Sequence, residues 1–141
     1  MIQRIQSIWL LLVSILGILS LKTSTFSGHR IKDIVPKPVV FVSGQYNLLL
    51  IVTTTAVAIA SFIAIFLYKN RRLQLRVTGF SCLISLIILG LYYWQSQSFI
   101  SEESSYNLTA LIPLSVPLLL LLAARGIWKD EQLVKSADRL R

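Results

Sequence analysis

Four long stretches without a charged side chain divide the sequence into alternating apolar and polar pieces. They cover residues 5–21, 46–68, 77–94 and 108–124. As helices with about 1.5 Å of rise per residue, stretches of roughly 17 to 23 residues are long enough to cross the hydrocarbon part of a bilayer. We therefore expect an all-α integral membrane protein, with a single four-helix transmembrane domain over residues 1–141.

The overall composition favours the same class. About 55% of the 141 residues are hydrophobic and only 14% are charged, whereas soluble domains contain about 25% charged residues. The first stretch is longer than the apolar part of a signal peptide, and no small-residue cleavage site follows it, so we expect an uncleaved helix. One Cys and one His exclude a disulfide framework, or a zinc site of several such ligands, built from this chain alone.

The distribution of Lys and Arg predicts the orientation. If both termini are cytoplasmic, ten of these residues lie inside and four outside, the outer ones being Lys22, Arg30, Lys32 and Lys37. Cytoplasmic flanks carry the excess of Lys and Arg, so we expect a multi-pass protein of the bacterial inner (cytoplasmic) membrane with both termini inside. The inner charges should meet anionic lipid headgroups. They are spread over membrane flanks rather than gathered on one face with stacking aromatics, so no nucleic-acid partner is expected.

The polar segments outside the stretches are short. The first outer loop, residues 22–45, is predicted either to form a small extended hairpin from segments 25–31 and 39–42 or to be an irregular connector. Residues 107–109 have the form of a glycosylation acceptor but lie against the fourth stretch, so we assign them no function. In the tail, residues 125–141, we expect a short cytoplasmic helix from residue 126 onward, which either docks on a partner or is simply solvated.

Small residues and prolines within the stretches are candidates for helix packing. Small side chains allow helix backbones to approach, and Ser or Thr hydroxyls can bond across the gap. A proline in an exposed helix interior costs about 3 kcal/mol, so we expect the fourth helix to bend around its second proline and to pack inside the bundle. The candidates are Ala56, Ala60, Ala64, Ser81, Ser85, Pro113 and Pro117.

Reactive groups are missing from the apolar stretches. Ionisable residues at membrane depth are costly and usually functional, and none of the four stretches contains Asp, Glu, His, Lys or Arg. His29 lies beside Arg30 in the outer loop, and Cys82 is expected to act as a small hydrophobic residue. We therefore predict no enzyme, no catalytic residue, no metal ligand set and no cofactor.

Three polar segments carry a family resemblance. Residues 1–6 (MIQRIQ), 68–74 (YKNRRLQ) and 129–141 (KDEQLVKSADRLR) resemble domain-of-unknown-function family 4293, and the resemblance covers essentially the whole chain. It implies a short four-helix inner-membrane protein of Bacteroidota without an assigned activity. By analogy, the polar string at the C-terminus supplies the candidate partner-docking residues, which are Lys129, Asp130, Lys135, Ser136, Asp138 and Arg139.

Two functional hypotheses follow. The first is a non-enzymatic accessory subunit or assembly factor that docks a membrane or cytoplasmic protein through its tail and through the basic link, residues 69–76. The alternative is a carrier or binder of a lipid or small apolar molecule, in a cavity near Pro117 lined by Thr53, Thr54, Thr55 and Ser85. A continuous pocket among the helices would favour the alternative, and tight packing there would favour the first hypothesis.

Overall fold

The computed structural model describes residues 2–28, 40–45, 47–97 and 105–138. Four helices account for most of them: α1 (Ile2–Lys22), α2 (Leu48–Phe66), α3 (Arg71–Ser96) and α4 (Leu111–Asp138). Two short 3-10 helices, η1 (Leu67–Lys69) and η2 (Leu108–Ala110), precede α3 and α4. Three strands, β1 (Ser24–Gly28), β2 (Val40–Ser43) and β3 (Ser105–Tyr106), complete the described elements.

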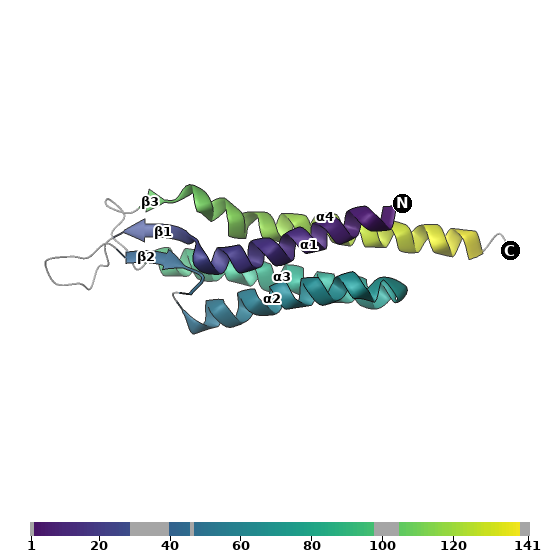
Figure 1. The fold of residues 1–141 in the computed structure, drawn as a ribbon, viewed down its shortest axis with the longest axis horizontal. Helices are drawn as coiled ribbons and strands as arrows, with labels where there is room; N and C mark the ends of the chain where they lie inside the picture. The colour runs from purple at the N-terminus through teal and green to yellow at the C-terminus, as the bar shows by residue number, and fades with distance from the viewer. Residues whose placement is uncertain (1, 29–39, 46, 98–104, 139–141) are drawn as a thin grey trace, which may run out of the picture.

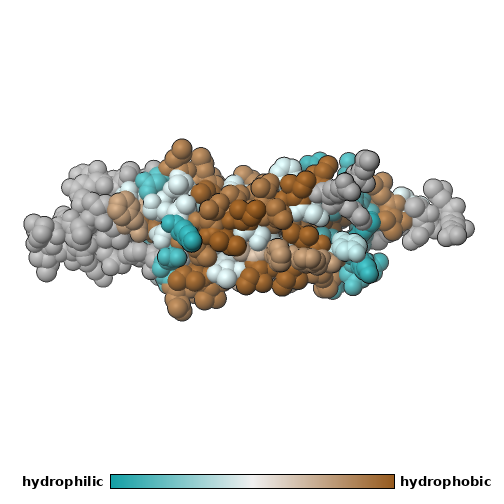
Figure 2. Space-filling model, in the orientation of Figure 1, coloured by the Kyte–Doolittle hydropathy of each residue, from teal (hydrophilic) through white to brown (hydrophobic). Residues whose placement is uncertain are grey.

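The helices form an elongated bundle in which α1 and α3 each pack against α2 and α4 (Figure 1). Helix α1 starts and α4 ends at one end of this bundle, which we call the terminal end, and the strands lie at the other, the sheet end. Hydrophobic residues cover the middle of the visible face, with hydrophilic groups near both ends (Figure 2). All four helices are long and apolar enough to cross a membrane, so the expected multi-pass membrane protein is supported.

The third and fourth helices are longer than the apolar stretches that predicted them. Helix α3 already begins at Arg71, so most of the basic link belongs to its first turns. Helix α4 continues through Pro117 to Asp138, so the tail extends the fourth helix and is not a separate one. Good helix formers such as Leu, Ala, Lys and Gln follow Pro117, and Gly126 alone does not end a helix. A bend around Pro117 stays a prediction.

The bundle interior combines aliphatic and small polar side chains. Leu10, Val57, Leu120 and Ile127 are completely or almost completely buried, and so are several Ser and Thr residues. Several of these hydroxyls bond within their own helix rather than across to a neighbouring one, whereas those of Thr54 and Ser61 have no hydrogen-bond partner among the described residues. For example, Thr78 Oγ1 donates to Gln74 O at 2.9 Å, and Ser85 Oγ donates to Cys82 O at 2.7 Å. Such bonds satisfy the hydroxyl locally, so the small size of these residues is what serves the packing.

The seven packing candidates differ in where they lie. Ala64, Ser81, Ser85, Pro113 and Pro117 are buried, Ala60 is half-buried and Ala56 is exposed. A step of four residues turns about 40° beyond a full helical turn, so Ala56 points about 80° away from Ala64. The buried face of α2 instead follows Thr54, Val57, Ser61 and Ala64, and Ala56 lies off this face.

A small sheet joins the two loops at the sheet end. Strand β1 pairs antiparallel with β2, with Ser24 opposite Ser43 and Gly28 opposite Val40, and β3 pairs with the other edge of β1. The hairpin expected from segments 25–31 and 39–42 is confirmed, and an irregular connector is wrong for the described part of this loop. His29, Arg30, Lys32 and Lys37 lie outside the described residues.

The segment Asn107-Leu108-Thr109, to which the sequence assigned no function, fastens the second loop to β1. Asn107 Nδ2 donates to Ser24 O at 3.2 Å and to Ser24 Oγ at 3.1 Å. The backbone N–H of Asn107 donates to Thr25 O at 3.1 Å. The hydroxyl of Thr109 also donates to Ser24 O. Side chains that bond to backbone groups in this way connect α1 with α4 through their loops.

Candidate functional site

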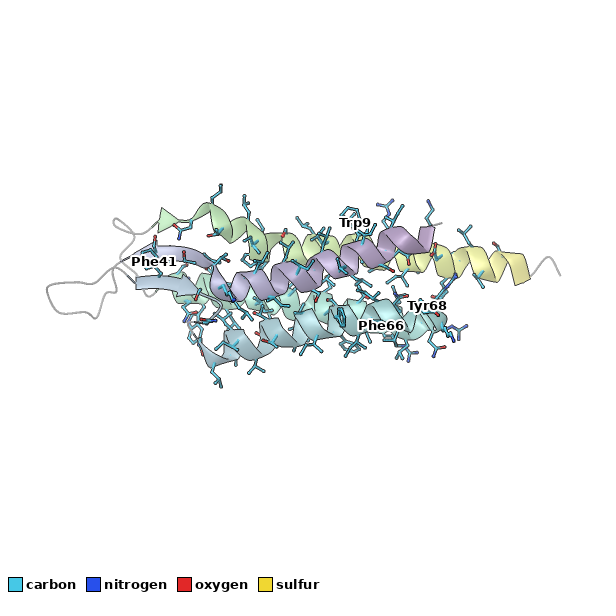
Figure 3. All side chains as sticks on the ribbon, in the orientation of Figure 1. Trp9, Phe41, Phe66 and Tyr68 are labelled. Atoms are coloured by element: carbon cyan, nitrogen blue, oxygen red, sulfur yellow. The ribbon has the colours of Figure 1, made fainter. Side chains whose placement is uncertain are left out.

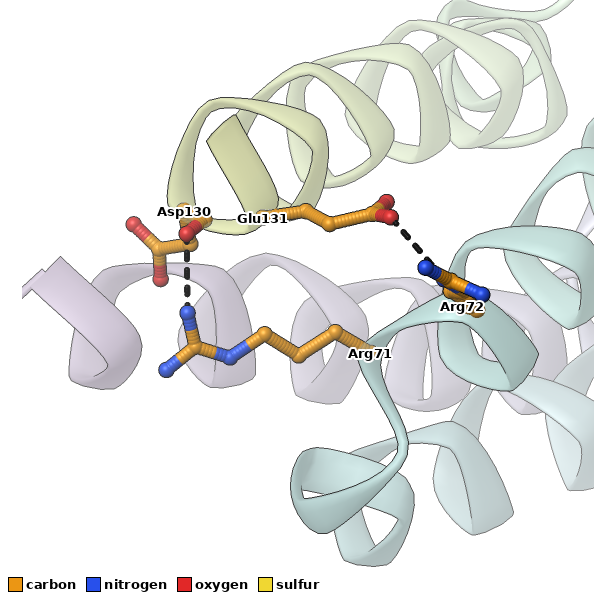
Figure 4. A network of polar contacts seen from close by, with 4 residues as sticks. All are labelled: Arg71, Arg72, Asp130 and Glu131. Atoms are coloured by element: carbon orange, nitrogen blue, oxygen red, sulfur yellow. Dashed lines mark hydrogen bonds and ion pairs between the residues drawn. The ribbon is translucent and has the colours of Figure 1, made fainter. Parts of the chain in front are cut away.

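The basic link and the tail, predicted as two separate segments, contact each other at the terminal end. Arg71 Nη1 donates to the backbone oxygen of Asp130 at 2.8 Å, and Arg72 Nε lies 3.4 Å from Glu131 Oε1 (Figure 4). The start of α3 is thereby joined to α4 about two turns before its end. Link and tail therefore line one surface together.

Asp130 lies at the centre of this junction and is buried. Only 6% of its surface is exposed, and its Oδ2 accepts a hydrogen bond of 2.7 Å from Gln6 Nε2 of α1. A Cβ atom at Gly126 would approach Gln6 Cγ to 2.8 Å, so glycine leaves the room that this bond needs. Asp130 therefore ties α1 to α4. Because its carboxylate is buried against α1, it does not belong to the exposed surface on which a partner was expected to dock.

A second buried side-chain amide, that of Gln74 in the basic link, bonds to α2. Gln74 Nε2 donates to Ala64 O at 2.9 Å, which joins α3 to the last turns of α2. Sequence reasoning missed Gln6 and Gln74. The available signal was that each is a polar residue within or beside a long apolar helix, where an unpaired amide would be costly.

The remaining candidate docking residues have different placements. Lys129 and Ser136 are exposed, and the Ser136 hydroxyl donates to Leu133 O at 2.8 Å. Lys135 and Asp138 belong to α4, but their side chains lie outside the described part of the structure, and so does all of Arg139. Lys129 and Ser136 are thus the two candidates that the structure places on the surface.

An open hollow of about 750 Å³, which we call the link–tail hollow, lies where the link meets α4. Four cationic side chains and one carboxylate line it, together with the neighbouring Asn70 and three side chains with large apolar parts. These are Lys69, Arg71, Arg72 and Arg76, then Glu131, then Tyr68, Leu73 and Val134. The hollow therefore carries a strong excess of positive charge beside apolar surface.

Two apolar pockets lie elsewhere on the bundle. One of about 290 Å³ is lined by β1, α3 and α4, including Phe26, Tyr92 and Pro113. The other, of about 470 Å³, lies between α1 and α2. Of the hydroxyls expected around a ligand cavity, Thr55 lines the second pocket, while Thr53 and Ser85 donate to carbonyls of their own helices. These hydroxyls do not gather around either pocket.

Titratable groups in the described ranges do not assemble into a metal site. No group of three or more His, Cys, Asp or Glu residues among them could hold a metal ion. Cys82 is a buried free cysteine on α3. The polar side chains at this end of the bundle supply guanidinium, ammonium and amide donors.

Comparison with known proteins identifies the family. The sequence model of the Domain of unknown function (DUF4293) matches residues 2–140, nearly the whole chain. The chain belongs to DUF4293. No curated protein and no solved structure matches this DUF4293 chain. The DUF4293 match includes both the basic link and nearly all of the tail, so the surface described above lies within the region that the family model covers.

Proposed function

We propose that this DUF4293 chain is a non-enzymatic accessory subunit or assembly factor of the bacterial inner membrane, with both termini in the cytoplasm. It docks a protein partner through the C-terminal part of α4. The observation that carries the proposal is that α4 projects beyond the other helices at the terminal end (Figure 1) while its contacts with Arg71 and Arg72 hold it in place. A helix fixed in this way is preorganised for binding, which reduces the entropic cost of association.

The C-terminal part of α4 has one continuous exposed face, which we call the projecting face. Lys129, Gln132, Leu133 and Ser136 are all exposed, and their spacing of three and four residues places them on one side of α4. Leu133 is 52% exposed in the middle of this set. An apolar side chain flanked by polar ones at this spacing is the pattern by which a helix binds in a partner's groove.

The orientation rests on charge and on helix number. Four spans place the start of α1 and the end of α4 at the same end of the bundle (Figure 1). This terminal end also holds the basic link and tail, and cytoplasmic flanks are enriched in Lys and Arg. The projecting face is then exposed to the cytoplasm.

Crosslinking in cells tests the docking proposal. A photoreactive amino acid placed at Leu133 or Gln132 of the full chain should give discrete protein adducts, identified by mass spectrometry. The same amino acid at Phe80, which is exposed on the apolar part of α3, is the control and should give lipid adducts only. The proposal fails if Leu133 and Phe80 give the same adducts, or if Leu133 yields no recurrent protein.

A carrier or binder of a lipid or apolar molecule is the weaker proposal. Of the four hydroxyl residues expected around its cavity, Thr55 lines the pocket between α1 and α2, while Thr53, Thr54 and Ser85 line neither this pocket nor the one at the sheet end. We therefore give precedence to docking.

A further inference from the structure

We propose that the link–tail hollow binds the phosphate group of an anionic phospholipid. This site goes beyond the proposed function, because it uses Lys69 and Arg76 rather than the projecting face. It does not depend on the identity, or the existence, of a protein partner.

The cationic side chains around the hollow are only partly compensated by acceptors. Arg71 and Arg72 are engaged by the backbone oxygen of Asp130 and by Glu131. Lys69 and Arg76 are exposed, and neither makes an ion pair with any other residue that the structure describes. Four cations and one carboxylate thus line the hollow, so its lining has a net positive charge. A phosphate would reduce their mutual repulsion and would accept charge-assisted hydrogen bonds from them.

The hollow lies beside the start of α3, whose first residues Arg71 and Arg72 line it. Asn70 is the N-cap of this 26-residue helix but makes no side-chain capping bond, and the first turn contains no acidic residue. A helix start carries a partial positive charge, which Arg71 and Arg72 only increase. An anion in the hollow would stabilise both the helix start and the cationic side chains.

The location of the hollow along the spans favours a lipid as the source of the phosphate. The hollow lies where two candidate spans meet, since one ends at Lys69 and the next starts at Arg71. Phospholipid headgroups lie at this level of a bilayer, and basic pockets between spans on the cytoplasmic side bind anionic ones. Tyr68, 53% exposed, and Leu73, 45% exposed, offer apolar surface beside the charges. Figure 3 shows Tyr68 and Phe66 near the terminal end of α2. A lipid matches this combination better than a free phosphate does.

Native mass spectrometry of the full chain in mild detergent tests the site. The chain should retain phosphatidylglycerol in preference to phosphatidylcholine. The variant Lys69→Gln/Arg76→Gln should bind phosphatidylglycerol about thirtyfold more weakly, because two cations near the anionic group are lost. Lys69→Arg/Arg76→Lys keeps both charges and should bind like the wild type. The matched control is Arg125→Gln, which removes an exposed charge on a different side of α4 and should leave binding unchanged.

Several outcomes would overturn the proposal. Equal retention of the two lipids, or an equal loss of binding in Arg125→Gln, would show that the hollow is not a specific site. Displacement of the lipid by stoichiometric inorganic phosphate would identify a free phosphate as the ligand. If Lys69→Gln/Arg76→Gln keeps the lipid but loses the protein adduct formed at Leu133, the hollow belongs to the protein-docking surface instead.

Discussion

At the scale of single residues, the terminal end depends on a buried polar pair. Asp130 and Gln6 lie 124 positions apart in the sequence and meet through a bond of 2.7 Å. The Asp130 backbone oxygen also accepts a hydrogen bond from Arg71 Nη1. One residue of α4 therefore contacts both α1 and the start of α3. Removing its carboxylate leaves a buried amide donor without its acceptor.

We expect Asp130→Ala to lower the free energy of unfolding by about 1–3 kcal/mol, the usual cost of an unsatisfied buried polar group. Lys129→Ala changes the exposed neighbouring residue and is the control. Both variants can be compared in detergent by their thermal unfolding midpoints. Equal midpoints for the two would show that the buried pair contributes nothing to stability.

Gly126 provides a second test of the same junction. In Gly126→Ala the new methyl group would lie 2.8 Å from Gln6 Cγ, whereas an added Cβ at Gly90 meets nothing within 4 Å. We therefore expect Gly126→Ala to lower the unfolding midpoint by displacing Gln6. Gly90→Ala should leave the midpoint unchanged or raise it slightly, since alanine favours a helix more than glycine does. A stable Gly126→Ala and a destabilised Gly90→Ala would contradict the packing of α1 against α4.

At the scale of elements, the sheet connects loops that follow different helices. Asn107 is the residue on which this connection depends, because its side chain and backbone reach Ser24 and Thr25. We expect Asn107→Ala to speed amide hydrogen exchange in β1 (Ser24–Gly28), measured by mass spectrometry. Gln97→Ala, which changes the exposed residue directly after α3, should leave that exchange unchanged. Unaltered exchange in Asn107→Ala would mean that β1 does not need this anchor.

The elements that the sequence predicted well are those with a long uniform signal. Charge-free runs located all four helices, and Val39 to Val42 after Pro38 indicated an extended arm. Strand β3 has only two residues, too few for any periodicity to appear. The continuation of α4 into the tail was missed because a change from apolar to charged residues marks the membrane boundary and not the end of a helix. Ala56 was wrongly expected on the buried face of α2, because residues spaced by four rotate progressively around a helix.

At the scale of the whole molecule, the arrangement joins segments whose contact no local pattern reveals. The polar string 129–141 and the basic link 69–76 each suggested a binding surface, but the sequence did not indicate that they touch. Their contact depends on α3 and α4 packing side by side, which is a tertiary property. For the same reason Asp130 was expected on the surface, although its carboxylate completes a bond between α1 and α4.

We propose that link and tail form one surface on the cytoplasmic side of a four-span bundle. Single cysteines at Phe41, Lys69 or Ser136, in a Cys82→Ser background, can be probed with a membrane-impermeant maleimide in sealed spheroplasts. Phe41 lies on the sheet, at the opposite end from Tyr68, which is next to Lys69 (Figure 3). We expect labelling of Phe41→Cys in sealed spheroplasts, and labelling of Lys69→Cys and Ser136→Cys only after lysis. Labelling of Ser136→Cys before lysis, or of Phe41→Cys and Ser136→Cys in the same compartment, would show that this orientation is wrong.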